Sequence, residues 1–225
     1  MTSRRAVRDE ITNVLDYLLE SDLAVSTNVV AIAHDRVTWQ SQRPGVQFFS
    51  GASHATIGEY RRWVSGGHYS AALRDGSLLQ LTYDFNGNEI RGHRLAYVPC
   101  PYLLDEELLS AGHPVLDVLD LYDGSGEVAL RSPIRFDYDP KNSKAGHPAA
   151  HMTLNNADCR IACIAPLHVL RFTDFVYRNF YSALWRAHES FFAAAGSRHL
   201  SEPVIVDDDR FSVHLAWDPH LRGTA

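Results

Sequence analysis

The chain has 225 residues, of which 45% are hydrophobic, 11% aromatic and 21% charged; this balance is typical of a packed globular protein and too apolar for a disordered chain. The formal net charge of -6 at pH 7 argues against a general nucleic-acid coat or a binder of anionic membranes, because both need a net positive field. The length fits one domain, residues 1–225, and the overall charge still allows a local basic pocket.

The cysteines and the N-terminus bear on the compartment. Cys100, Cys159 and Cys163 are odd in number and form no C-x-x-C motif, so we expect buried free thiols in a reducing cytoplasm and no zinc site. The first residues, MTSRRAVRDEITNVLDYLL, alternate charged and apolar positions and lack the apolar run of a signal peptide or a membrane span. We therefore expect a cytoplasmic protein with no membrane partner.

Periodicity predicts the first third of the chain. Ile11, Val14, Leu15 and Leu18 recur at three and four residues, which indicates an amphipathic helix. Short strands are expected over residues 28–34, 36–40 and 46–50. A second helix is expected over residues 56–64, ending at Gly66-Gly67 because paired glycines stop helices.

Turn chemistry predicts the middle of the chain. Asp75-Gly76 and Asn86-Gly87-Asn88 separate β-prone runs, and both tolerate the positive φ of tight hairpins, so residues 68–99 should form an antiparallel meander. Two short helices are expected next, over residues 103–109 and 115–121. Further strands are expected over residues 127–139, 149–155 and 159–165.

The last third contains the longest periodic segment. Apolar and aromatic residues at helical spacing predict one long core helix from 168 to 195. A closing hairpin is expected over residues 203–219, with Phe211, Val213, Leu215 and Trp217 alternating inward. The predicted fold class is α+β, a largely antiparallel sheet of hairpins packed by the N-terminal helix and the long C-terminal helix.

Polar residues alternate on two of these strands. Successive side chains of a strand point to opposite faces, so Asp137 shares a face with Arg135 and Asp139, while His151 shares one with Thr153 and Asn155. If the two strands pair, these polar faces lie side by side. Arg160 could join from the following strand, and His147 lies at the mouth of the connecting loop.

His93 and Arg94 form a second polar pair, in GHRLAYVPCP. His93 shares a face with Leu95 and Tyr97, so a hydrogen-bonded core histidine is favoured over a ligand-binding one. Arg94 points to the other face.

Several interpretations of the polar positions are compatible with the sequence. Alternation alone produces a solvent-facing sheet surface, although His, Asp, Arg and Asn together supply the donors, acceptors and titratable groups of a site. A metal site could use His147 and His151 with Asp137 or Asp139. A two-histidine phosphoesterase could use H-x-[ST] at His68 and His151.

Nucleophile-elbow and nucleotide-loop motifs are absent from the sequence, which contains no G-x-S-x-G, P-loop or G-x-G-x-x-G pattern. The remaining alternative is binding without catalysis. Phosphate or a nucleotide could be recognised by charge-assisted donors from Arg160, Arg94, His93 and His151.

An ordered set of segments, DGSLLQLTYDF, HRLAYVPCP, HPAAHMTLNN, CRIACIAPL and FTDFVYRNFY, resembles an uncharacterised bacterial family of the domain-of-unknown-function type, over residues 5–190. The resemblance implies a bacterial cytosolic protein from variable gene neighbourhoods, including phage defence, and supplies no reaction. Its motif positions in this chain are Asp75, Gln80, His93, Arg94, His147, His151, Asn155, Arg160 and Tyr181.

Two hypotheses of function follow. In the first, the protein is a recognition subunit that binds a phosphorylated or nucleotide-like ligand, or a partner protein, with His93, Arg94, His147, Thr153 and Asn155 as ligand-binding residues. In the second it is a metal-dependent or histidine-based nuclease or phosphoesterase. His151 is then the general base or a metal ligand, Asp137 orients it or holds the metal, and Arg160 stabilises phosphate charge. The sequence identifies no cofactor or metal.

Overall fold

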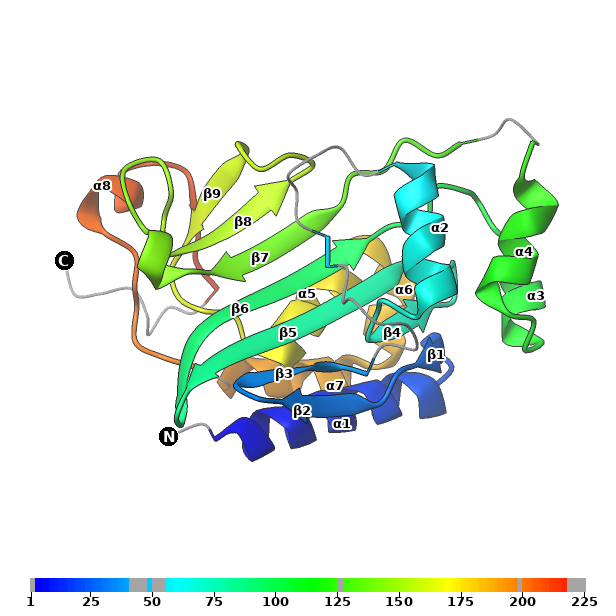
Figure 1. Cartoon of the computed structure of the whole chain (residues 1–225), viewed down its shortest axis with the longest axis horizontal. Coiled ribbons are helices and arrows are strands. Elements are labelled where there is room, and N and C mark those ends of the chain that lie inside the picture. Colours follow the sequence, from blue (N-terminus) through cyan, green and yellow to red (C-terminus); the bar gives the residue numbers. More distant parts are fainter. Residues whose placement is uncertain (1–2, 41–47, 50–55, 125–127, 198–199, 218–225) are drawn as a thin grey trace.

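The fold is built on one continuous sheet, with strands in the order β1-β4-β5-β6-β7-β8-β9-β10; β3 also pairs with β5, and β2 with β3 (Figure 1). The computed structural model describes residues 3–40, 48–49, 56–124, 128–197 and 200–217. Every strand pair in these ranges is antiparallel except β9 with β10. The strands are β1 (Ala24–Thr27), β2 (Val30–Ala33), β3 (Arg36–Trp39), β4 (Ala71–Leu73), β5 (Leu78–Asn86), β6 (Glu89–Val98), β7 (Ile134–Tyr138), β8 (Ala150–Leu154), β9 (Arg160–Cys163) and β10 (His214–Leu215).

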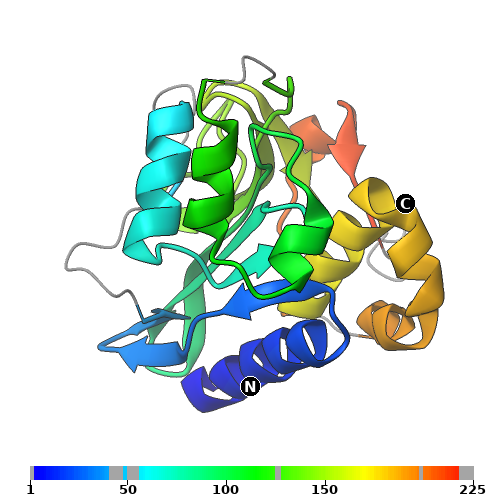
Figure 2. The same cartoon turned by 90° about the vertical axis from the view of Figure 1, so that its right-hand side faces the viewer.

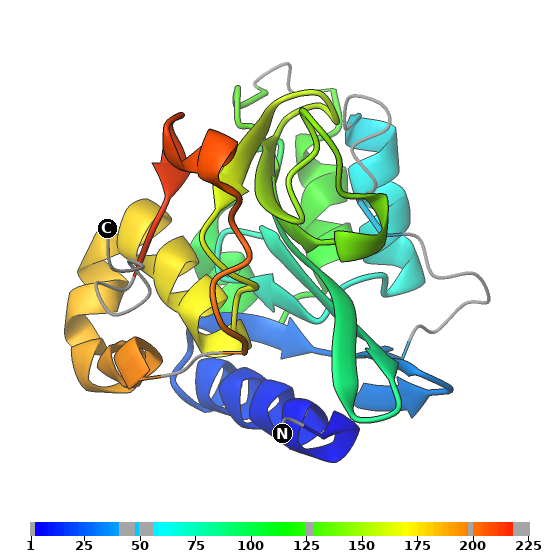
Figure 3. The ribbon, with the colours of Figure 1, turned by 90° about the vertical axis from the view of Figure 1, so that its left-hand side faces the viewer.

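Helices cover both faces of the sheet, which confirms the predicted α+β class. Figures 2 and 3 show α2 beside α4 on one side of the strands, and α5 with the helices that follow it on the other. The helices are α1 (Arg4–Glu20), α2 (Ile57–Gly66), α3 (Glu106–Ser110), α4 (Val115–Tyr122), α5 (Val169–Phe180), α6 (Ser182–Ala187), α7 (Glu189–Ala193) and α8 (Asp207–Arg210), with 3-10 turns η1 (Pro140–Asn142) and η2 (Ala194–Ser197). No helix of the described ranges is long and apolar enough to cross a membrane.

The N-terminal helix forms where the apolar stripe predicts it. The Ser3 side chain caps α1 by accepting from the Ala6 N–H, which satisfies one of the free donors of the first turn. The stripe of Val7, Ile11, Val14, Leu15 and Leu18 is buried.

The central meander also forms as predicted. β4 and β5 join through Asp75-Gly76, and the Asp75 carboxylate accepts from the Ser77 N–H at 2.9 Å, which fixes the turn. Gly76 has a φ of 82°, and a Cβ there would lie 2.8 Å from a methyl carbon of Leu104. The positive φ is what favours glycine in this turn, since the Leu104 methyl group could shift to admit a Cβ.

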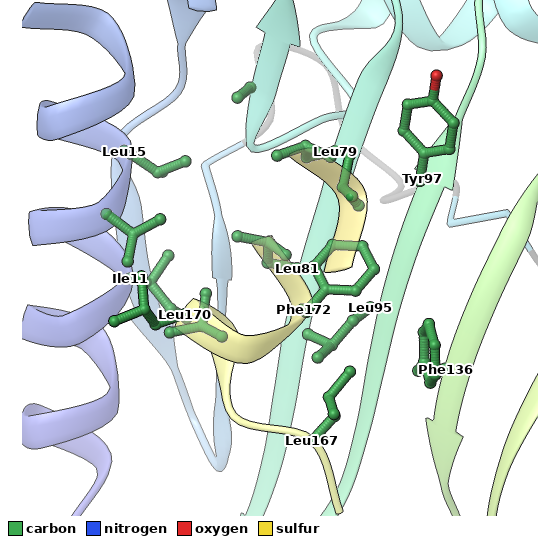
Figure 4. Close-up of a cluster of buried hydrophobic side chains, with 14 of the residues drawn as sticks. Ile11, Leu15, Leu79, Leu81, Leu95, Tyr97, Phe136, Leu167, Leu170 and Phe172 are labelled. Atoms are coloured by element: carbon green, nitrogen blue, oxygen red, sulfur yellow. The ribbon is translucent and has the colours of Figure 1, made fainter. Parts of the chain in front are cut away.

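The main hydrophobic core lies between the sheet and helices α1 and α5. Figure 4 shows Ile11 of α1 and Phe172 of α5 reaching the same cluster as Leu81 and Leu95 of the sheet. A second cluster packs α2, α3 and α4 against the opposite face, over Ala72, Leu78, Ala96 and Val98. This second cluster covers strands β4 to β6 and leaves the β7 to β9 end of that face to other side chains.

The prediction of one helix from 168 to 195 is wrong, because the segment breaks into α5, α6 and α7. Tyr181 (φ -134°, ψ 51°) and His188 (φ -118°, ψ 26°) leave the helical region. Each is bound to a distant element: the Tyr181 hydroxyl donates to Asp75, and the His188 ring is hydrogen-bonded to Tyr17. Helical periodicity does not predict such contacts between distant residues, and no glycine or proline lies at the two breaks.

The predicted closing hairpin over 203–219 is also wrong. The described part of this segment, 203–217, contains α8 and the short strand β10, which pairs parallel with β9. Phe211 and Val213 are 92% and 85% exposed, whereas Leu215 and Trp217 do pack on the core. The pair of strands that would have turned Phe211 inward is not formed.

Smaller differences concern the boundaries of elements. Within 128–139, the described part of the expected strand over 127–139, only β7 is a strand; α3 starts at Glu106 rather than at 103, and β9 ends at Cys163. The strand expected over 46–50 lies mostly outside the described residues, and its described part, Phe48 and Phe49, is not in a strand.

All three cysteines are free. Cys100 and Cys163 are buried as expected, and burial raises the pKa of Cys100 to about 11. Cys159 is exposed, contrary to expectation, because it ends the turn before β9.

Candidate functional site

β7 pairs with β8, which is the condition under which the sequence places the two polar faces side by side, and the register aligns the polar positions across four strands. Asp137 lies between Arg94 on β6 and His151 on β8. In the neighbouring row, Thr153 lies between Arg135 on β7 and Arg160 on β9. We call this set the polar face: Arg94, Arg135, Asp137, His151, Thr153 and Arg160.

The polar face is largely buried. Arg135, Asp137, His151 and Thr153 are 8%, 5%, 2% and 0% exposed. This burial excludes the solvent-facing sheet surface that alternation alone would produce. Ionised groups withdrawn from water in this way must be paired, because each carries a large desolvation cost.

The Asp137 carboxylate is the centre of the cluster. Arg135 Nε donates to its Oδ2 at 2.6 Å, and Arg94 Nε lies 3.8 Å from Oδ1. Burial raises the pKa of Asp137, but the interaction with His151 and the charge and hydrogen bond of Arg135 outweigh burial, so the pKa lies below its ordinary value. Asp137 is therefore an ionised, buried anion at neutral pH.

His151 uses both of its ring nitrogens inside the protein. Its Nδ1 lies 2.8 Å from the Pro148 carbonyl oxygen, which can only accept, so this nitrogen carries a proton. Its Nε2 lies 3.5 Å from Asp137 Oδ2. A general base needs a free nitrogen facing the substrate, and this geometry leaves His151 none; it suits a residue that anchors the loop before β8.

His147, in that loop, has the free nitrogen that His151 lacks. The centres of the two imidazole rings are 4.8 Å apart, and His147 Nδ1 is buried without a hydrogen-bond partner in the described part of the chain. Burial, followed by the charges of His151 and Arg160, lowers the pKa of His147. A neutral imidazole with one uncommitted nitrogen results.

Two arginines of the polar face are only loosely paired. Arg160, with a side chain 22% exposed, lies 4.0 Å from a fully exposed Asp158, and Arg94 is 55% exposed. Ion pairs at such distances and exposures contribute little. The Thr153 hydroxyl, in register with Arg160, is buried and has no partner among the described residues.

Phe49 and Gln80 support the cluster, and the alternation of β7 and β8 could not identify either. Arg135 Nη1 donates to the Phe49 carbonyl at 3.1 Å, and the Phe49 N–H donates to Gln80 Oε1 at 2.8 Å. The signal for Gln80 was a polar residue within the apolar run LLQL, and the resemblance gave the same position. Phe49 carries no such signal, because only the fold brings it over the Arg135 guanidinium.

His93 and Asn155, both predicted to bind ligand, lie apart from the cluster. His93 projects to the opposite face, where its Nε2 accepts from the Leu167 N–H at 2.8 Å, and burial lowers its pKa to about 4. It has the position of the hydrogen-bonded core histidine that the sequence favoured. Asn155 is exposed in the turn after β8, with a φ of 60°.

The two catalytic alternatives with defined geometry find little support. His68 precedes β4, and β5, β6 and β7 separate β4 from β8, so His68 and His151 do not form a pair on neighbouring strands. Within the described ranges, no three His, Cys, Asp or Glu side chains are grouped so that they could hold a metal ion. What the polar face can do is hold an anion, since its guanidinium groups outnumber its carboxylate.

These features define an α+β protein whose antiparallel sheet carries a buried, predominantly cationic cluster at one end. The chain belongs to a family of uncharacterised conserved proteins, DUF2290, whose sequence profile matches residues 23–217. The match contains every residue of the polar face and His147. No curated protein and no solved structure gives a match to this chain.

Proposed function

We propose that this protein is a recognition protein that binds a small phosphorylated or nucleotide-like ligand at the polar face. The observation that carries the proposal is the charge of the cluster: it contains the guanidinium groups of Arg94, Arg135 and Arg160 but one carboxylate, that of Asp137, which contacts Arg94 and Arg135 and not Arg160. The carboxylate of Asp137 balances the charge of Arg135, whose Nε lies 2.6 Å from Oδ2. Arg94 and Arg160 are therefore available to bind an anion.

The phosphate end of the ligand belongs at Arg160. This side chain is partly exposed, and its charge contributes to the lowered pKa of His147. The unpaired Thr153 hydroxyl is its neighbour in register. Together they offer a charged donor, a ring nitrogen and a hydroxyl, which suit the several acceptor oxygens of a phosphate.

The remainder of the ligand extends toward Arg94. Three strand spacings separate β6 from β9, so the two arginines start about 14 Å apart along the sheet. An extended molecule with a second polar end, such as a nucleotide, fits this separation better than a free phosphate. His93 and Asn155 take no part in this version of the site.

A second candidate function is a phosphoesterase or nuclease that works without a metal. It is favoured by His147, whose unpartnered Nδ1 and lowered pKa are the properties of a general base at neutral pH. In this version Arg160 stabilises charge on the phosphate. His151 and Asp137 take no part in the reaction: His151 anchors the loop at Pro148, and Asp137 positions Arg135.

Isothermal titration with phosphate and with adenosine monophosphate tests the binding proposal. Arg160→Gln should weaken binding by about tenfold to a hundredfold, because hydrogen bonds to charged groups contribute about 1.5–3 kcal/mol. Arg210→Gln is the matched control, since Arg210 is 33% exposed and also lies 4.0 Å from an exposed aspartate. Equal affinities for wild type, Arg160→Gln and Arg210→Gln would rule out the site.

Release of nitrophenolate from bis(4-nitrophenyl) phosphate, measured with chelator present, separates recognition from hydrolysis. Hydrolysis that is lost in His147→Gln and retained in His93→Gln would favour the esterase. Binding of adenosine monophosphate without any release from the diester would favour recognition alone.

The proposal includes a bacterial cytoplasmic setting in phage defence, which comes from the resemblance and is compatible with the free thiols. The proposal also includes a partner protein as an alternative ligand of the polar face. Plaque counts on cells that express wild type or Arg160→Gln test this setting: protection by wild type alone would tie it to the polar face, and equal counts would remove it.

A further inference from the structure

A cavity lies on the opposite face of the sheet from the polar face. It has a volume of about 470 Å³ and is lined by residues from the β4–β5 turn, the ends of β6, β7 and β8, the α5–α6 junction and the segment before β7. We call it the aromatic cleft; its lining includes Asp75, Tyr97, Leu130, Arg131, Phe180 and Tyr181. Small-molecule sites in proteins occupy about 300–1,000 Å³, so the size suits a ligand.

The polar wall of the aromatic cleft is a directed chain of hydrogen bonds. The Tyr181 hydroxyl donates to Asp75 Oδ1 at 2.9 Å, so its oxygen is left to accept from the Tyr97 hydroxyl at 3.1 Å. The Tyr97 oxygen in turn lies 3.4 Å from the Ser77 hydroxyl. Asp75 also accepts from the Ser77 N–H and pairs with Arg131, so both of its carboxylate oxygens are already hydrogen-bonded within this wall.

Arg131 is the charged group of the cleft that retains free donors. It gives one hydrogen bond, from Nη1 to Asp75 Oδ2 at 3.1 Å, and its side chain is 32% exposed. A guanidinium has five N–H donors, and no other partner of Arg131 occurs in the described ranges. The remaining donors can bind a carboxylate or phosphate in the bidentate mode.

The opposite wall is apolar and unusually exposed. The Leu130 side chain is 103% exposed and that of Phe180 is 43% exposed, although both are large hydrophobic groups at the rim of a cavity. The Phe180 ring stacks on Tyr97, with centroids 4.7 Å apart and an interplanar angle of 27°. A planar ligand ring can extend this stack, and aromatic contacts of this kind contribute more than their buried area.

We propose that the aromatic cleft binds a small planar aromatic anion, a ring that carries a carboxylate or a phosphate. The ring packs between Leu130 and the Phe180–Tyr97 stack, and the anionic group takes the free donors of Arg131. Asp75 holds Arg131 in place through one hydrogen bond and presents no free carboxylate to the ligand.

The aromatic cleft is independent of the site in the proposed function. Ile134 and Leu154 line it, and each alternates along its strand with a residue of the polar face, Arg135 and Thr153 respectively. Successive residues of a strand point to opposite faces, so the sheet separates the two sites. Variants in one site should leave ligand binding in the other unchanged.

Isothermal titration with four probes tests the proposal: 2-naphthoate, adenosine monophosphate, adenosine and acetate. The wild type should bind 2-naphthoate or the nucleotide, and bind adenosine and acetate at least tenfold more weakly, because each lacks one half of the ligand. The two anionic probes distinguish a carboxylate from a phosphate. Failure of the wild type to bind either anionic aromatic probe would overturn the proposal.

Three substitutions locate the binding. Arg131→Gln should weaken the bound anionic probe about tenfold or more, and Leu130→Ser should weaken it severalfold. Leu130→Ser cannot damage the core, because that side chain is fully exposed, so it keeps the test valid if Arg131→Gln destabilises the Asp75 network. Phe180→Leu removes the ring from the stack and should also weaken binding.

Matched controls exclude general effects. Arg4→Gln removes an arginine that is 35% exposed and bound through Nη1 to an aspartate at 3.0 Å, and Leu121→Ser removes an exposed leucine from α4. Both should leave the affinity for 2-naphthoate unchanged, as should Arg160→Gln. Affinity unchanged in both Arg131→Gln and Leu130→Ser would overturn the site, whereas loss in Arg160→Gln alone would assign the aromatic anion to the polar face.

Discussion

Phe136 and Asp137 are neighbours on β7 with almost the same burial, 3% and 5% exposed, but they point to opposite faces of the sheet. Phe136 packs edge-on against Phe172 and Phe175 of α5. Asp137 lies among guanidinium and imidazole groups. One strand therefore buries hydrocarbon on one side and ionised groups on the other.

The two faces differ in what burial requires. On the α5 face, any well-shaped apolar side chain recovers the free energy of removing its surface from water. On the polar face, each charge needs its partners, and a buried ion pair is often no more stable than an apolar replacement of the same volume. Stability alone does not account for a cluster of this kind, and this is one reason for the proposal that it binds a ligand.

The largest effect should come from removing the shared carboxylate. Asp137→Ala leaves the Arg135 guanidinium buried without its counter-charge and His151 Nε2 without its neighbouring carboxylate, so we expect the free energy of unfolding to fall by about 3–5 kcal/mol. Urea denaturation measures this change.

Asp84→Ala is the control for that variant. Arg36 Nε lies 2.6 Å from Asp84, the same distance as between Arg135 and Asp137, but the Arg36 side chain is 49% exposed. A solvated pair should cost no more than about 1 kcal/mol. Equal losses in the two variants would show that burial does not set the energetics of the polar face.

The next effect is a pH dependence that originates on the opposite face. Burial lowers the pKa of His93 from 6.5 to about 4, so the unfolded chain takes up a proton in this window and the folded chain does not. The contribution of neutral His93 is fully present above pH 6.5 and is lost as the pH falls toward 4. At about 1.4 kcal/mol for each pH unit, the loss approaches about 3 kcal/mol.

His93→Gln should remove the part of this slope that belongs to His93, because glutamine keeps an acceptor for the Leu167 N–H and does not titrate; the part due to His147, whose pKa burial also lowers, should remain. Unfolding free energies of wild type and variant, measured between pH 7 and pH 4, make the comparison. Asp137 should not contribute to the slope between pH 7 and pH 4. Because its pKa is lowered, its contribution to the unfolding free energy is present above the ordinary carboxyl pKa and is lost only below about pH 3.8. Parallel profiles for the two proteins would contradict the assignment of His93 as a buried neutral histidine.

Sequence reasoning was most successful where the controlling interactions are local. The stripe of Ile11 to Leu18, the turn at Asp75-Gly76 and the alternation along residues 134–138 are properties of adjacent residues, and each produced a correct element. Alternation also gave the facing of Asp137 and His151.

It failed where a distant contact decides. The break at Tyr181 depends on Asp75, more than a hundred residues earlier, and the exposure of Phe211 depends on β10 pairing parallel with β9. The role of His151 depends on Asp137, whose carboxylate lies 3.5 Å from Nε2, the ring nitrogen that a general base would need. Periodicity predicts on which face of the sheet a side chain lies, but it does not predict which atoms are its hydrogen-bond partners.

The smallest expected effect on stability is the sharpest test of why the polar face exists. The triple variant Arg135→Met, Asp137→Leu and His151→Phe replaces the buried charges with apolar groups of similar volume, so its unfolding free energy should stay within about 1 kcal/mol of wild type or exceed it. Its affinity for adenosine monophosphate should fall at least tenfold, because the loop that carries His147 loses the hydrogen bond from His151 to Pro148. A stability loss as large as that of Asp137→Ala would make the cluster a structural requirement, and unchanged stability with unchanged affinity would remove it from ligand recognition. The proposal therefore requires that the triple variant keeps its unfolding free energy and loses its affinity for adenosine monophosphate, because the cluster is then needed for the ligand and not for the fold.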